Sequence, residues 1–290
     1  MTTQTIGFIG LGRMGGPMTA RLVNAGERVI GFDAAGTAAR LPAGAEGADS
    51  VAELAARTET VFLSLPDGPI SEAVCAQIAA AEPRATRTVV NLSTVGVESA
   101  QRCERVLQPG GVGYLDAPVS GGVAGARNGT LSIMVGGDAA RLESVQPLLA
   151  VLSKRTFHVG TETGQGQAMK LLNNYASAAA LAATSEAVVF GVRMGLDLVQ
   201  MVEVLNASTG SSSASTDKFP RSIVPRTYDY GFAAAMMTKD VRLYRESAEA
   251  AGSPHELADT LTRVWEQFLE AEPQADFTAI HRYLEQRPTE

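Results

Sequence analysis

The start of the chain places a glycine-rich turn between a short apolar strand and a helix. Residues 6–9 run directly into the turn at 10–15 (Gly-Leu-Gly-Arg-Met-Gly), and Met18, Leu22 and Val23 follow at helical spacing. G-x-G-x-x-G in this setting is typical of a dinucleotide pyrophosphate site, because free N–H groups at the helix N-terminus favour negative charge. A glycine turn without a ligand is the alternative, and the second strand has to decide between them.

The second predicted strand, residues 28–32, ends at Asp33, which lies 23 residues after Gly10. A carboxylate at this place accepts hydrogen bonds from the ribose hydroxyls and repels a 2′-phosphate. No arginine follows it within residues 34–36. The sequence therefore favours NAD as the cofactor over NADP.

The first half of the chain alternates β-rich runs with segments of helical periodicity such as 50–57 and 70–81, the pattern of a doubly wound, mostly parallel sheet. Ligands of such sheets bind at the carboxyl ends of the strands. Leu65-Pro66 and Ser93-Thr94, which end two of the runs, are therefore expected near the cofactor. The candidate strands are residues 5–9, 28–32, 60–64, 87–91, 113–115, 131–135 and 155–158.

The character of the sequence changes near residue 164. A stretch rich in Ala and Leu follows Gly166 and reaches Gly191 without Pro or Gly, which predicts one long helix. Its apolar residues cover too much of the circumference for a surface helix, so we expect it to be buried against other helices. The fold class is an α/β Rossmann domain (1–163) and an all-α domain (164–290). Further helices are expected at 197–206, 240–250, 254–271 and 275–286.

Charge and composition argue against several classes of protein. The net charge of −7 disfavours a nucleic-acid surface, and no uninterrupted apolar run is long enough to span a membrane. Cys75 and Cys103 fit no metal motif and the three histidines are scattered, so no metal is expected. The two lone thiols, and a start that does not resemble a signal peptide, favour the cytoplasm.

Two clusters carry groups that suit binding and proton transfer. Ser120-Gly121-Gly122 offers backbone N–H groups and a hydroxyl to a carboxylate, with an ordinary tight loop as the alternative. Lys170 is the only cation between residues 168 and 190, and Asn174 shares its helix face. A lysine in such surroundings can exchange a proton with an alcohol oxygen. The alternative is a lysine that extends from the helix start to solvent.

Four motifs together resemble the β-hydroxyacid dehydrogenase family, which includes 3-hydroxyisobutyrate dehydrogenase and tartronate semialdehyde reductase. They are residues 7–15, residues 116–122, the G-x-G-x-x-x-K-x-x-N-N pattern of 164–174, and Lys239-Asp240. The resemblance extends from about residue 6 to residue 251. It implies a Rossmann domain followed by a helical domain of the 6-phosphogluconate dehydrogenase type, which commonly forms homodimers or homotetramers.

The resemblance also implies a role for each motif. Lys170 is the expected catalytic acid/base and Asn174 a catalytic, substrate-contacting residue, while Lys239 lies near both nicotinamide and substrate. Ser120, Gly121 and Gly122 are expected to hold the substrate's carboxylate. The implied reaction is the NAD-dependent interconversion of a small β-hydroxyacid and its semialdehyde. The implied cofactor-binding residues are Gly10, Leu11, Gly12, Arg13, Met14, Gly15, Asp33, Leu65, Pro66, Thr94 and Lys239.

Some alternatives stay open at this level. The hydroxyl-rich segment 208–216 suits either a flexible connection or the rim of a polar pocket. Lys218 and Arg221 could pair with an anionic group of a larger substrate or face solvent. Imine reductases share the expected layout but usually lack the lysine, and a non-catalytic NAD-binding protein would have replaced it. The particular hydroxyacid is not predicted.

Overall fold

The computed structural model describes residues 5–287, and the chain divides into two compact units after Lys170. We call residues 1–170 the α/β unit and residues 171–290 the helical unit. The division lies inside one helix, α8 (Gln165–Arg193), whose first turns belong to the α/β unit. The predicted domain boundary at residue 163 lies just before this helix.

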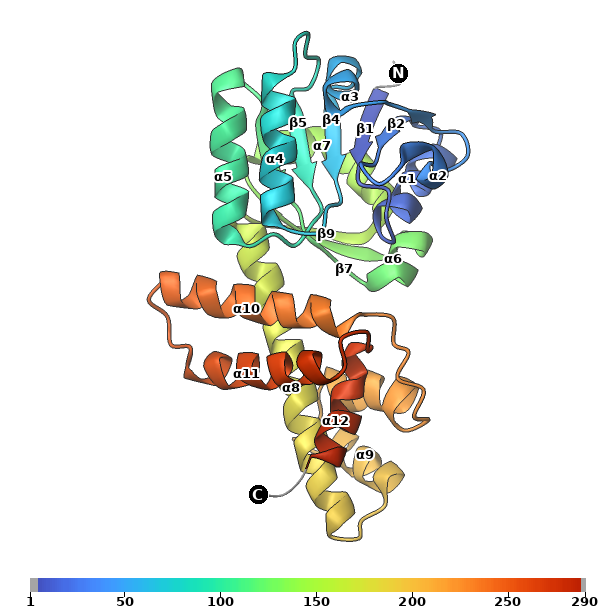
Figure 1. Ribbon diagram of the computed structural model, residues 1–290, viewed down its shortest axis with the longest axis vertical. Coiled ribbons are helices and arrows are strands. Elements are labelled where there is room, and N and C mark those ends of the chain that lie inside the picture. The colour runs from blue at the N-terminus through green and yellow to red at the C-terminus, as the bar shows by residue number, and fades with distance from the viewer. Residues whose placement is uncertain (1–4, 288–290) are drawn as a thin grey trace. The chain divides into compact units, whose positions relative to one another are not determined.

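The α/β unit holds every strand that the structure assigns to a sheet within residues 5–287 (Figure 1). Its strands are β1 (Thr5–Ile9), β2 (Arg28–Phe32), β3 (Glu46–Gly47), β4 (Thr60–Leu63), β5 (Thr88–Asn91), β6 (Gly113–Asp116), β7 (Val119–Ser120), β8 (Leu131–Gly136) and β9 (Ser153–Gly160). Its helices before α8 are α1 (Gly15–Asn24), α2 (Thr37–Arg40), α3 (Val51–Arg57), α4 (Gly68–Ala80), α5 (Val97–Leu107), η1 (Gln108–Gly110), α6 (Gly122–Asn128) and α7 (Ala139–Leu152).

The strands form one sheet in the order β3-β2-β1-β4-β5-β6-β8-β7, with β9 paired to β8. All pairs are parallel except β6–β8 and β7–β8. The predicted doubly wound, mostly parallel sheet is therefore confirmed, and all seven predicted strands are present. Every residue of β4 and β5 is buried, as expected for central strands that are covered on both faces.

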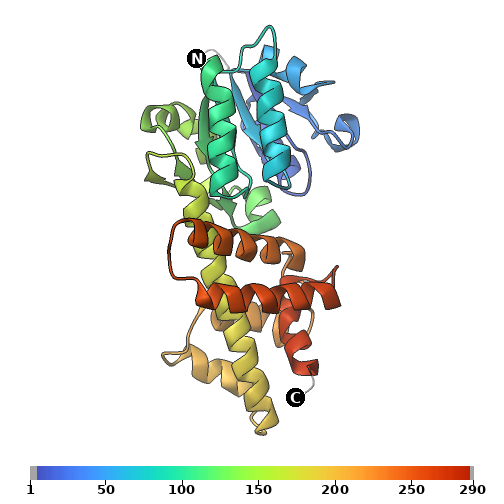
Figure 2. The ribbon, with the colours of Figure 1, turned by 60° about the vertical axis from the view of Figure 1, so that its left-hand side comes forward.

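Helices cover both faces of the sheet and enclose one apolar core on each side. One core contains residues of α1, α6 and α7, and the other contains residues of α3, α4 and α5. Both ribbon views show α4 and α5 side by side on their face (Figures 1 and 2). Local signals fix the helix ends. The Ser50 hydroxyl, at the N-cap of α3, accepts from the Glu53 amide at 3.1 Å, and the Glu53 carboxylate accepts from the amide of the preceding residue, Asp49.

The helical unit packs around the remainder of α8. Its other elements are α9 (Leu198–Asn206), the π-helix η2 (Ala214–Ile223), α10 (Ala234–Ala250), α11 (Glu256–Ala271), η3 (Phe277–Ala279) and α12 (Ile280–Gln286). The helices α10 and α11 lie side by side in both ribbon views (Figures 1 and 2). Trp265, Phe268 and Phe219 are fully buried in the core of this unit. The prediction that this part of the chain is helical is confirmed.

Part of the predicted loop at 208–216 is helical. Its last residues begin η2, so the expectation of a loop is wrong from Ala214 onward. The local signal was misleading because serine and threonine favour turns. Burial of Ala214, Phe219 and Ile223 in the core of the helical unit overrides that preference.

The long helix α8 meets a length-and-composition criterion for a membrane span, with a mean hydropathy of 1.4 in its most apolar window. The expectation from the sequence concerned uninterrupted apolar runs, and α8 is not one, because polar residues such as Asn173, Asn174 and Glu186 interrupt it. Ala178, Leu181 and Val188 of α8 are buried in the core of the helical unit. We interpret α8 as a core helix.

Candidate active site

The glycine turn after β1 has the shape that a dinucleotide requires. Gly10 has φ +93°, and a Cβ atom there would lie 2.2 Å from the Ser64 carbonyl oxygen. A Cβ on Gly15 would lie 1.8 Å from the Gly10 carbonyl oxygen, so the helix can approach the strand only because this residue is glycine. A Cβ on Gly12 would meet no atom within 4 Å. The residues present therefore fit a bound pyrophosphate, with open space at Gly12.

Asp33 directly follows β2, and its side chain connects the end of that strand to the glycine turn by a hydrogen bond. Its Oδ2 accepts from the Leu11 amide at 2.8 Å and its Oδ1 from the Ala35 amide at 2.8 Å. Burial opposes ionisation, but these two amides and the charge of Arg40 together hold the pKa of the Asp33 carboxyl below its usual value. Asp33 is thus an ionised acceptor beside the glycine turn.

The loops after β4 and β5, which carry Leu65, Pro66 and Thr94, are joined to each other. The Leu65 amide donates to the Ser93 hydroxyl at 2.8 Å, and the Ser93 amide donates to the Asn91 side chain at 3.0 Å. The structure therefore brings these two predicted cofactor segments together at the carboxyl end of the sheet.

Gln167 is a buried residue that the sequence did not single out. Its side-chain oxygen accepts from the amides of Val95 (2.9 Å) and Gly96 (3.2 Å), and its Nε2 donates to the Ser93 carbonyl at 3.0 Å. Gln167 thereby ties the first turn of α8 to the loop after β5. The one signal in the sequence is a polar residue that directly follows Gly166 in an apolar helix.

Asp116 ends β6 and holds the start of α8. Its Oδ1 accepts from the Gly164 amide at 2.9 Å and its Oδ2 from the Gln167 amide at 2.7 Å. The side chain is fully buried, and this burial raises the pKa of Asp116 to about 6. Lys170 follows less than one helical turn after Gln167. Asp116 and Gln167 therefore fix the turn of α8 that presents this lysine.

The Ser120–Gly122 segment makes a sharp change of direction between β7 and α6. Gly121 has φ +128° and Gly122 has φ +62°, and a Cβ on Gly122 would meet no atom within 4 Å. Consecutive residues of this kind turn their backbone N–H groups into a concave arrangement that suits an anion. The assignment of this segment to the substrate's carboxylate stays a prediction.

Lys170 and Asn174 are both buried, with 7% and 6% of their surface exposed. They lie four residues apart on α8 and so share one face of the helix. Within the helical unit, the side-chain Nδ2 of Asn174 donates to Oδ2 of Asp240 at 2.6 Å, and the Lys239 ammonium lies 3.5 Å from Oδ1 of Asp240. The buried Asp240 therefore brings together two predicted site residues, Asn174 and Lys239.

The two basic residues of η2 differ in their surroundings. Lys218 is buried and donates to the Ser213 hydroxyl at 3.0 Å, and burial lowers the pKa of its ammonium. Arg221 is exposed and pairs with Asp217 at 3.2 Å. Arg221 therefore faces solvent, whereas Lys218 does not.

This fold and this set of residues define a two-domain, nucleotide-dependent oxidoreductase. Residues 5–160 match the family model of the NAD-binding domain of 6-phosphogluconate dehydrogenase. Residues 164–284 match the model described as the NAD-binding domain of NADP-dependent 3-hydroxyisobutyrate dehydrogenase. The chain belongs to the β-hydroxyacid dehydrogenase family and is an NAD-dependent enzyme of that family.

Relatives and a solved structure agree with this assignment. A 2-(hydroxymethyl)glutarate dehydrogenase from Eubacterium barkeri is 37% identical, over 90% of this chain and 88% of the relative. A 2-hydroxy-3-oxopropionate reductase from Escherichia coli K12 is 36% identical, over 84% of each. The structure of Mycobacterium tuberculosis 3-hydroxyisobutyrate dehydrogenase with L-serine aligns with a TM-score of 0.90 and 33% identity, covering 98% of this chain and 99% of the other.

The likeness of this chain to solved imine reductases shows a shared fold alone. The enzyme from Streptomyces aurantiacus is 21% identical, with a TM-score of 0.63. Imine reduction, the alternative that the sequence left open, is therefore the more distant relationship.

Proposed function

We propose that this enzyme interconverts a small β-hydroxyacid and its semialdehyde, with Lys170 as the general acid/base. The observation that carries the proposal is the burial of Lys170 on an apolar helix, directly after the turn that Asp116 and Gln167 hold. Residues 10–15 and Asp33 would hold the dinucleotide, which would accept a hydride from the substrate's β-carbon or supply one in the reverse direction. The Lys170 amine takes the hydroxyl proton as the alcohol becomes an aldehyde, and returns it in the reverse direction.

Three further roles belong to this proposal. Asn174 orients the reacting oxygen, and its own orientation is supported by the hydrogen bond to Asp240. Lys239 adds positive charge near the nicotinamide and an anionic substrate. Ser120, Gly121 and Gly122 hold the carboxylate, and the named substrates of relatives, together with the L-serine of the solved structure, support a small carboxylate.

The carboxylate role predicts the effect of Gly122→Val. A β-branched residue is strained at φ +62° and would change the backbone conformation of the Ser120–Gly122 segment. We therefore expect the substrate KM to rise about tenfold or more while the Kd of NADH is unchanged. Gly111→Val is the matched control, because Gly111 has φ +70° and equally open surroundings. An unchanged KM for Gly122→Val would remove this segment from substrate binding.

The reaction itself is tested with the purified protein and a panel of hydroxyacids. NADH formation is followed with 3-hydroxyisobutyrate, 3-hydroxypropionate, glycerate, L-serine, threonate and larger dicarboxylic analogues. We expect turnover with at least one of them. Tight NADH binding without turnover of any member would contradict the proposed substrate class and leave the cofactor assignment standing.

We also propose that the two domains of the chain have different functions. Residues 1–163 form the cofactor domain, and residues 164–290 form the domain for substrate binding and self-association. The family models support the position of the boundary, because one ends at residue 160 and the other begins at residue 164. The two buried cysteines and the bacterial relatives support a cytoplasmic location.

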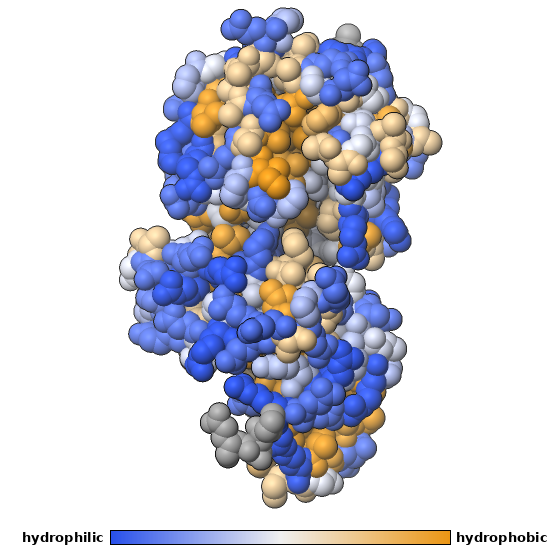
Figure 3. Space-filling model, in the orientation of Figure 1, coloured by the Kyte–Doolittle hydropathy of each residue, from blue (hydrophilic) through white to orange (hydrophobic). Residues whose placement is uncertain are grey.

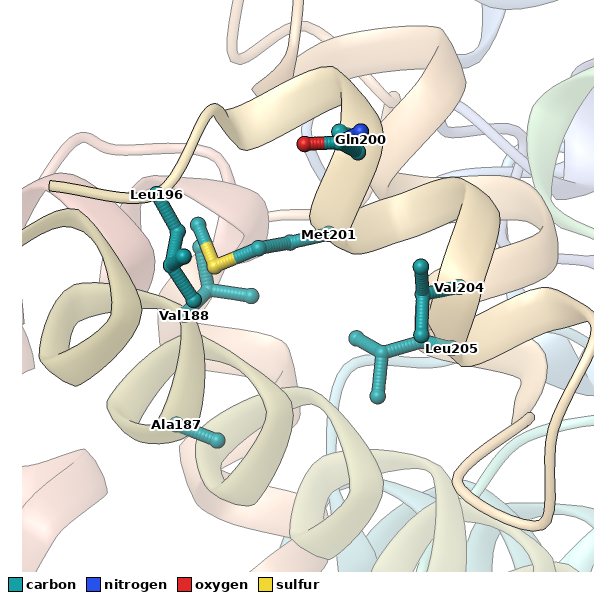
Figure 4. A pocket seen from close by; sticks show the side chains of 7 residues that line it. All are labelled: Ala187, Val188, Leu196, Gln200, Met201, Val204 and Leu205. Atoms are coloured by element: carbon teal, nitrogen blue, oxygen red, sulfur yellow. The ribbon is translucent and has the colours of Figure 1, made fainter. Parts of the chain in front are cut away.

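Self-association through the helical unit is supported by its exposed apolar residues. Phe190, Met194 and Val204 are each more than half exposed, near the end of α8 and on α9. Figure 3 shows orange, apolar surface at the lower end of the helical unit. Leu196 and Met201 line an apolar pocket between the same two helices (Figure 4). Exposed apolar patches of this kind are typical of protein–protein contacts.

A charge at Phe190 tests the association. We expect Phe190→Asp to lower the mass measured by light scattering to that of a smaller assembly, because an ionised carboxylate cannot be buried in an apolar contact. Leu257→Asp, at another highly exposed leucine on α11, is the control and should leave the mass unchanged. Wild-type protein that is monomeric would contradict this part of the proposal.

A further inference from the structure

The carboxylate of Asp33, which should select NAD, already has a positively charged partner. Nη1 of Arg40 lies 3.3 Å from Oδ1 and 3.2 Å from Oδ2 of Asp33. The sequence favoured NAD because no arginine follows within residues 34–36. The structure shows that an arginine further along the chain returns to the same place.

A tight turn and the short helix α2 bring Arg40 back to Asp33. The Asp33 amide donates to the Thr37 hydroxyl at 3.0 Å, and the Gly36 amide donates to the Asp33 carbonyl at 3.0 Å. The Asp33 carboxylate also accepts from the Ala35 amide, an Asx turn that closes the loop. One turn of helix from Thr37 then ends at Arg40. The position of the guanidinium is therefore built by several local hydrogen bonds.

Arg40 keeps donors available for a ligand. Its side chain is 43% exposed, and its hydrogen bonds to Asp33 within residues 5–287 are made by Nη1 alone of the five-donor guanidinium group. An arginine near this aspartate position is the group that accommodates the 2′-phosphate of NADP. Its fork of N–H donors matches the geometry of a phosphate.

We propose that Arg40 is a second determinant of cofactor choice and that the Asp33–Arg40 pair lets this enzyme bind NADP as well as NAD. Asp33 alone would repel the 2′-phosphate, and Arg40 offsets that repulsion at the same point. Arg40 also competes with the ribose hydroxyls for the oxygens of Asp33. Its loss therefore weakens NADP binding and leaves NAD binding equal or tighter.

The test measures binding of the reduced cofactors by fluorescence titration, without any substrate. For Arg40→Gln we expect the Kd of NADPH to rise about tenfold or more, since a charge-assisted phosphate contact is lost, and the Kd of NADH to stay equal or to fall. For Asp33→Asn we expect tighter NADPH binding. When Arg40→Gln is added to Asp33→Asn, NADPH binding should no longer be tighter than in the wild type. Arg28→Gln is the matched control, because Arg28 is an exposed arginine of β2 that pairs with Glu46.

Several outcomes would overturn the proposal. Wild-type protein that binds NADH but shows no measurable NADPH binding would do so, as would an NADPH Kd that is equal in wild type and Arg40→Gln. A change of the same size in Arg28→Gln would show that general charge, rather than Arg40, is responsible. Because no substrate is present, these results do not depend on which hydroxyacid the enzyme turns over.

Discussion

Lys170→Ala is expected to lower kcat by about 10²–10⁴-fold, the range that a positioned general acid/base contributes. The substituted enzyme has no group on this face of α8 to take the hydroxyl proton. Binding of NADH should change little, because the glycine turn and Asp33 that form the cofactor site are untouched. Steady-state kinetics with the best substrate of the panel measure kcat, and a fluorescence titration measures the Kd of NADH.

Two control variants separate the proton-transfer role of Lys170 from the effect of its positive charge and from the loss of a lysine elsewhere in the chain. Lys154→Ala removes an exposed lysine of β9 and should leave kcat unchanged. Lys170→Arg keeps the positive charge but presents a group that does not deprotonate in proteins, so it should remain slow. A Lys170→Ala enzyme with nearly wild-type kcat would remove this lysine from the mechanism.

Gln167→Ala is expected to destabilise the α/β unit by about 3 kcal/mol or more, because it leaves three buried backbone groups without partners. These are the amides of Val95 and Gly96 and the carbonyl of Ser93. The free energy of unfolding from urea titration measures the effect. The variant should also lose kcat, since the turn before Lys170 is then no longer tied to the loop after β5.

Gln165→Ala is the matched control for this prediction. Gln165 lies in the same first turn of α8 and is exposed, and its side-chain oxygen accepts from the Glu162 amide at 2.9 Å. The control should lose much less stability than Gln167→Ala. Equal losses in the two variants would show that the hydrogen bonds of Gln167 contribute no more to the free energy of unfolding than the hydrogen bond of Gln165.

The elements that the sequence predicts well are those with a long or strongly apolar pattern. The central strands β4 and β5 and the helix α8 are of this kind. The two-residue strands β3 and β7 were missed because so short a segment has no measurable periodicity. The π-helix η2 was missed in part because its serine and threonine residues favour turns, whereas Phe219 and Ile223 gain more from burial.

The residues of the candidate site also differ in how readily the sequence reveals them. Residues in local motifs, such as the glycine turn and the Lys170–Asn174 pair, can be found from spacing alone. Gln167 cannot, because its partners at residues 93–96 are more than seventy positions away in the chain. Arg40 was overlooked because a turn and a helix return it to Asp33. Gln167 therefore acts through long-range contacts, and Arg40 through a local turn whose geometry a single sequence does not reveal.

The burial of Asp116 makes folding of this chain a proton-linked reaction. Its carboxyl has a pKa of about 6 in the folded protein, against 3.8 as the reference for an unfolded chain. Between these values the unfolded chain is ionised at this position and the folded chain is protonated, so folding near pH 5 takes up about one proton here. The contribution of Asp116 to stability is largest below pH 4 and declines as the pH rises to 6. At neutral pH the enzyme therefore keeps a buried charge under the first turn of α8, at a cost in stability that mild acid removes.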